Sequence, residues 1–96
     1  MLRREGLTVT PTKDQFFTGS EKYEAIYEAL KLMEKNKPAA ALMRMRGAMP
    51  DTTMEQLKMT VTMNEMGGLF AYGRITAKGH EYYKSMIDSA REMANR

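Results

Sequence analysis

Apolar residues recur every three or four positions from residue 20 onward, which is the spacing of one face of an α-helix. The first helix is predicted from Ser20, a suitable capping residue, to about Asn36. Its apolar face consists of Tyr23, Ile26, Tyr27, Leu30 and Met33. Pro38 suits the first turn of a second helix that runs to about Gly47.

A third helix is predicted to open with the capping-box spacing of Thr52 and Glu55 and to end at the glycines 67–68. This helix has two apolar stripes on nearly opposite sides. One stripe consists of Met54, Leu57 and Val61, and the other, the methionine stripe, of Met59, Met63 and Met66. We expect the methionine stripe to pack in the core beneath the second helix and the hairpin. The alternative is a soft, adaptable contact surface for a protein partner.

A short β-hairpin is predicted after the third helix, because Leu69-Phe70 and Arg74-Ile75 are β-prone and half apolar. Gly73 supplies the positive φ that a tight turn between them needs. Thr76 can then cap a last amphipathic helix over residues 77–94. That helix spans nearly 30 Å at about 1.5 Å per residue, more than a small core needs to cover.

The order helix, helix, helix, hairpin, helix resembles a winged helix-turn-helix domain. The passage Arg74-Ile75-Thr76-Ala77-Lys78-Gly79-His80-Glu81-Tyr82-Tyr83 is similar to the segment after the wing in small YjcQ-like proteins, in PadR- and MarR-type regulators and in archaeal chromatin proteins. The resemblance implies a mainly α fold with a small β-hairpin: three helices, a short wing and a long C-terminal helix. The polar and basic residues of 1–19 predict a partly disordered arm, pinned where Phe16 and Phe17 find apolar surface, and the winged-helix domain is expected over residues 20–96.

The resemblance also implies a DNA-binding site, with the third helix in the major groove of double-stranded DNA. The residues expected to contact base edges are Gln56, Thr60 and Asn64, and those expected to hold phosphates are Arg44, Arg46, Lys58, Arg74 and Lys78. An equally weighted alternative is that Gln56, Thr60 and Asn64 are only a polar strip in contact with water. The distal part of the last helix is expected to form a homodimer through Tyr83, Ile87, Ala90 and Ala94.

Charge and composition are compatible with this expectation without requiring it. The formal net charge is +3, and the positive excess falls within residues 37–84, where seven Lys or Arg face four Asp or Glu. The chain has no cysteine and one histidine, His80, so we expect no metal site and no cofactor and place His80 at the surface. No apolar run approaches a membrane span, and no catalytic motif is found.

We therefore expect a cytoplasmic DNA-binding protein, not an enzyme, that acts as a transcriptional regulator or a minor chromatin component. The alternative is a protein-interaction module on the same scaffold, such as a phage-encoded accessory factor, which would use the methionine stripe. Outward methionines would favour this alternative. A basic surface joining Lys58, Arg74 and an arginine of the second helix would favour DNA.

Overall fold

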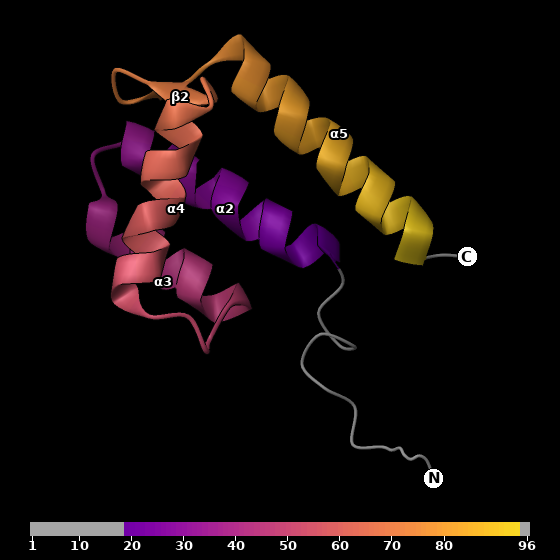
Figure 1. Cartoon of the computed structure of the whole chain (residues 1–96), viewed down its shortest axis with the longest axis horizontal. Coiled ribbons are helices and arrows are strands. Elements are labelled where there is room, and N and C mark those ends of the chain that lie inside the picture. The colour runs from indigo at the N-terminus through magenta and orange to yellow at the C-terminus, as the bar shows by residue number, and fades with distance from the viewer. Residues whose placement is uncertain (1–18, 95–96) are drawn as a thin grey trace, which may run out of the picture.

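The computed structural model describes residues 19–94, so the expected arm falls outside them except for Gly19. The elements in chain order are α2 (Gly19–Glu34), α3 (Pro38–Ala48), α4 (Met54–Met66), β2 (Phe70–Ala71), β3 (Arg74–Ile75) and α5 (Ala77–Ala94) (Figure 1). The described chain is thus mainly helical with one two-stranded antiparallel hairpin. This architecture is compatible with a winged helix.

The ends of α2 differ slightly from the predicted ones. The helix already includes Gly19, so Ser20 lies within it rather than at its cap, and Ser20 is buried. After Glu34 the chain turns through Asn36, whose φ of 60° lies in the left-handed region that ends many helices. Pro38 then begins α3, as predicted.

The cap of α4 lies one residue later than predicted. Thr53 is extended, its hydroxyl accepts the backbone N–H of Gln56 at 3.1 Å, and the Gln56 side chain accepts the backbone N–H of Thr53 at 2.9 Å. Thr52 cannot take this role because it belongs to the preceding turn, where its N–H donates to the carbonyl of Met49. The predicted capping pair of Thr52 and Glu55 is therefore wrong by one residue.

The second strand and α5 follow the prediction, whereas β2 lies one residue later than the predicted Leu69-Phe70. Phe70 pairs with Ile75 and Ala71 with Arg74, and the two turn residues Tyr72 and Gly73 both have positive φ, 54° and 74°. Two positive φ values are the mark of a tight hairpin turn whose twist matches that of the strands. The Thr76 hydroxyl accepts the N–H of Gly79 at 3.0 Å, which caps α5 as predicted.

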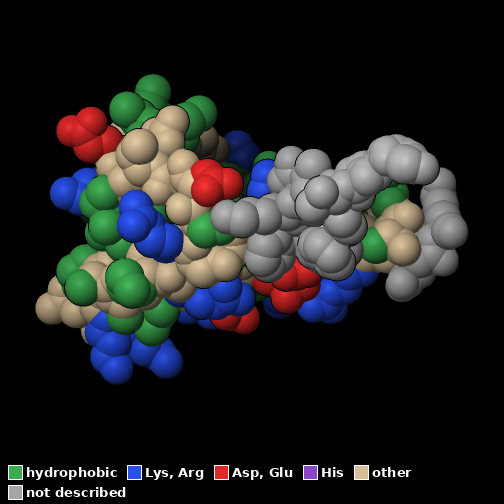
Figure 2. Space-filling model, turned by 90° about the horizontal axis from the view of Figure 1, so that it is seen from below, with side chains coloured by type: hydrophobic (Ala, Val, Ile, Leu, Met, Phe, Trp, Pro, Cys, Tyr) green, Lys and Arg blue, Asp and Glu red, His purple; other side chains and the backbone are tan. Residues whose placement is uncertain are grey.

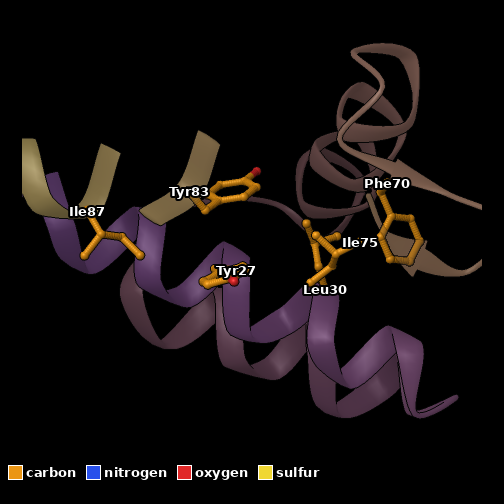
Figure 3. Packing of buried hydrophobic residues seen from close by; sticks show 6 residues of the cluster. All are labelled: Tyr27, Leu30, Phe70, Ile75, Tyr83 and Ile87. Atoms are coloured by element: carbon orange, nitrogen blue, oxygen red, sulfur yellow. The ribbon is translucent and has the colours of Figure 1, made fainter. Parts of the chain in front are cut away.

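The core lies on two sides of α2. Ala29 packs with residues of α3 and α4, namely Ala41, Met45 and Leu57. On the other side, Tyr27 and Leu30 pack against the hairpin and α5 through Phe70, Ile75, Tyr83 and Ile87 (Figure 3). This central position of α2 leaves α4 and α5 on different flanks, and the two helices diverge from the hairpin (Figure 1).

Candidate interaction surface

The methionine stripe faces solvent. Met59, Met63 and Met66 are 57%, 64% and 81% exposed, whereas Leu57 and Asn64 on the other side of α4 are buried. The expectation that this stripe packs in the core is therefore wrong. Leu57 fills the space against α2 and α3, and a helix that buries one side must present the opposite side to water.

An open pocket of about 280 Å³ lies beside the methionine stripe, between α4 and α5. Its lining residues are Thr60, Met63, Asn64, Leu69, Tyr82 and Tyr83. Met63 and Tyr82 are both exposed, at 64% and 40%, so they form the accessible part of the lining. Asn64 and Tyr83 are buried and form its floor.

A hydrogen bond between two helices holds the pocket floor together. The Tyr83 hydroxyl of α5 donates to Asn64 Oδ1 of α4, and Asn64 Nδ2 donates to the carbonyl of Thr60 at 2.7 Å. Burial raises the pKa of Tyr83 to about 12, which keeps the phenol protonated as a donor. Asn64, expected to read a base edge, therefore has its amide engaged inside the fold.

The expected dimer residues are divided between the core and the surface. Tyr83 and Ile87 are only 3% and 8% exposed because α2 covers them, and the Tyr83 ring stacks on Tyr27 with centroids 5.6 Å apart. These two side chains therefore pack within one chain, and the dimer interface stays a prediction. Ala90 is half-buried and Ala94 is exposed at the end of α5.

The remaining base-reading residues form bonds within α4. Gln56 is part of the capping box, and the hydroxyl of Thr60 donates to the carbonyl of Gln56 at 3.0 Å. Hydrogen bonds from Thr to the preceding turn are a common local satisfaction of that side chain. All three side chains, Gln56, Thr60 and Asn64, thus form hydrogen bonds within the fold. Gln56 is exposed and Thr60 is half-buried.

The structure distributes the expected phosphate-binding cations over four elements. Arg44 Nε donates to Glu28 Oε1 at 2.6 Å, and half-buried Arg46 donates through Nη2 to the carbonyl of Thr52 at 3.1 Å. Lys78 Nζ donates to the carbonyl of Gly67 at 3.2 Å, at the C-terminal end of α4 where a cation is favourable.

The other two cations are exposed on different elements. Lys58 lines a small pocket with Pro38 and Leu42 on the α3 side of α4, and Arg74 lies on β3. The charged residues of α4 are Lys58, Glu55 and Glu65, so the helix has a net charge of −1. Figure 2 shows hydrophobic side chains exposed between Lys and Arg side chains at the end of the molecule that holds α3 and α4.

His80 is half-buried rather than at the surface, which corrects the expectation. Its Nδ1 lies 2.5 Å from the Tyr27 hydroxyl, and the two rings meet edge to face. Burial, with a smaller effect of the Glu34 charge, raises the pKa of Tyr27. We assign His80 to the contact between α2 and α5.

Among residues 19–94, no group of three or more His, Asp or Glu side chains is placed to hold a metal ion. None of the helices in this range is long and apolar enough to cross a membrane. Comparison of the chain with protein-family models, with curated proteins and with solved structures finds no match.

Sequence reasoning missed two residues that shape the pocket and its surroundings. Gly79 lies where the backbone carbonyl of Leu69 crosses α5, and a Cβ there would be 2.1 Å from that oxygen. Its signal in the sequence is a glycine in the first turn after the Thr76 cap. Tyr83 lies on the apolar side of the last helix, and its hydroxyl is the signal that a buried partner such as Asn64 exists.

Proposed function

We propose that this chain is a protein-interaction module that docks an amphipathic helix of a partner protein on α4. The observation that carries the proposal is the outward exposure of the methionine stripe next to the pocket between α4 and α5. In this arrangement the apolar side of the partner helix covers the stripe, and one large apolar side chain enters the pocket. This is the helix-in-groove mode of recognition.

The chemistry of the stripe suits such a partner. Methionine is unbranched and polarizable, so a surface of methionines adapts to differently shaped apolar side chains. Met59, Met63 and Met66 are spaced four and three residues apart, which places all three on one side of α4. A helix laid along that side meets all three side chains. The neighbouring Tyr82 and Leu69 extend the apolar contact toward α5.

The charges near α4 favour protein over DNA as the partner. A helix that enters the major groove lies among phosphates, and α4 has a net charge of −1. The basic surface that would favour DNA requires an arginine of α3 beside Lys58 and Arg74. Arg44 is instead paired with Glu28, and Arg46 is bonded to the α3–α4 turn.

The test compares two charge-introducing variants at equally exposed methionines. Met63→Glu places a carboxylate at the mouth of the pocket, and Met43→Glu places one on α3 at the same 64% exposure. Proteins retained by the wild-type chain are identified, purified and titrated against all three chains. We expect Met63→Glu to weaken the affinity by roughly 30-fold or more, as for a central contact, and Met43→Glu to leave it nearly unchanged. Equal binding by Met63→Glu and wild type overturns the proposal.

DNA binding is the second candidate, favoured by the winged-helix-compatible order of elements and by exposed Arg74 and Lys58. Its test is fluorescence anisotropy with a random-sequence duplex over a salt series. Micromolar affinity that falls steeply with salt, and that drops further in Lys58→Ala and Arg74→Ala, supports it. The absence of DNA binding at low salt excludes this candidate. The two functions are separated by the methyl resonances of Met63 and Met66, which should shift with the protein partner and not with DNA.

A further inference from the structure

A second exposed apolar surface lies on α5, away from the methionine stripe. Tyr82, Met86 and Met93 are four and seven residues apart, so they share one side of the helix, and we call them the α5 strip. Tyr82 is 40% and Met93 70% exposed, and Met86 is half-buried. The ring of Tyr23 from α2 borders the strip, with its centroid 6.5 Å from that of Tyr82.

The last turns of α5, which carry Met93, lie close to the point where the described chain begins. Arg91 donates to Glu24 Oε2 through Nη2 at 2.8 Å and Nε at 3.1 Å, which fixes the last turns of α5 beside the first turns of α2. Figure 1 shows the start of α2 and the end of α5 on the same side of the molecule. The described chain therefore begins beside the last turns of α5, the part of the helix that carries Met93.

The sequence places two large apolar side chains at this entry. Phe16 and Phe17 are adjacent, and no other aromatic residue precedes Gly19. An extended chain advances about 3.6 Å per residue, so Phe17 reaches about 7 Å and Phe16 about 11 Å from Gly19, before the length of the side chain is added. One turn of α2 separates Gly19 from Tyr23, about 6 Å. Both rings are thus within reach of Tyr23, whose ring borders the strip.

We propose that Phe16 and Phe17 dock on the α5 strip, in cis. A tethered segment meets its own surface at a high effective concentration, whereas a second copy has to pay the full entropy of association. Contact between the two rings and the strip would remove apolar surface of both from water, which is favourable. The docked segment shares Tyr82 with the pocket between α4 and α5, so it lies at the edge of the surface proposed for the partner helix. The inference does not depend on that function.

A single tryptophan tests the proposal, because the chain contains none. In the full-length chain, Phe17→Trp should give native emission that is blue-shifted and protected from a collisional quencher relative to the same chain in denaturant. Adding Met86→Ser and Met93→Ser should remove the shift and the protection. Adding Met43→Ser, at a methionine of α3 that is 64% exposed, should leave both unchanged. Phe16→Trp repeats the measurement at the neighbouring position.

Three results overturn the proposal. The first is a tryptophan that is equally accessible to quencher in the native and denatured chains, at both positions. The second is protection that persists after the strip substitutions, because the rings then dock elsewhere. The third is protection that grows with protein concentration, because the contact is then made between two copies. Circular dichroism of each variant confirms that the helices are retained, and a partner titration is not needed for any of these results.

Discussion

Alanine substitution of two helical glycines should change stability in opposite directions. Gly47 lies inside α3, and a Cβ built there meets nothing within 4 Å. Gly79 lies in the first turn of α5, and a Cβ there would be 2.1 Å from the carbonyl oxygen of Leu69 and 2.8 Å from Cγ2 of Ile75. An added methyl group therefore meets no steric hindrance at Gly47 and clashes with the backbone at Gly79.

The magnitude follows from what has to move. Relief of the Gly79 clash requires the loop and the helix to separate by roughly 1 Å, an overpacking that costs about 1–3 kcal/mol. The Leu69 carbonyl also accepts the N–H of Thr76 at 3.0 Å, a bond worth about 1 kcal/mol that the shift weakens. The better helix propensity of alanine returns at most about 1 kcal/mol. The net loss for Gly79→Ala is about 1–3 kcal/mol.

For Gly47→Ala only the helix propensity changes, so the chain should gain up to about 1 kcal/mol. Thermal unfolding followed by circular dichroism resolves the two effects, because 1 kcal/mol shifts the midpoint of a domain of this size by about 4–8 °C. We expect a lower midpoint for Gly79→Ala and a higher one for Gly47→Ala. If both variants gain stability, the close approach of the Leu69 carbonyl to α5 is refuted.

The remaining predictions concern the cap, the pocket floor and the methionine stripe. Thr53→Ala should lower the free energy of unfolding by about 1 kcal/mol because it removes the α4 cap, while Thr52→Ala should lower it less; a urea titration that ranks them in reverse contradicts the observed cap. Asn64→Ala leaves the Tyr83 hydroxyl without its partner and should cost about 1–3 kcal/mol in the same assay. Since burial raises the pKa of Tyr83 to about 12, the unfolded chain binds fewer protons above about pH 10. The contribution of Tyr83 to stability, complete below that pH, should fall by about 1.4 kcal/mol per pH unit between the two values. An ultraviolet phenolate titration should show late-ionising tyrosines, with Tyr83 among them. Met63→Glu should unfold within about 0.5 kcal/mol of the wild type, since its side chain is exposed; a larger loss in urea would mean that the stripe is structural.

Local signals predicted the elements of this fold well. Pro38 at the start of α3, Gly73 in the hairpin turn and Thr76 at the cap of α5 each act through backbone conformation or a bond to a near neighbour, so a single segment contains the information. The Thr52–Thr53 pair shows where this information ends. Both residues fit a cap, and the choice depends on the turn after α3, which uses Thr52.

The surface could not be predicted in the same way, because periodicity identifies stripes but not what covers them. The two apolar stripes of α4 are similar in size, and Leu57 is buried only because Ala41 and Met45 of α3 pack on it. Asparagine is a polar residue type that is usually found at the surface. Asn64 is buried because Tyr83, nineteen residues further along, supplies a hydrogen-bond donor that makes its burial tolerable.

The way α4 is held explains why its outer side can serve a partner. Leu57 and Asn64 are seven residues apart, two helical turns, so both anchors lie on one side of the helix. One anchor is apolar and contacts α3, and the other is polar and contacts α5. Together they fix the rotation of α4 without any contribution from the methionine stripe. Because the stripe side chains are exposed, substitutions there should be nearly independent of the stability of the fold. The same independence makes binding and stability separable in experiment.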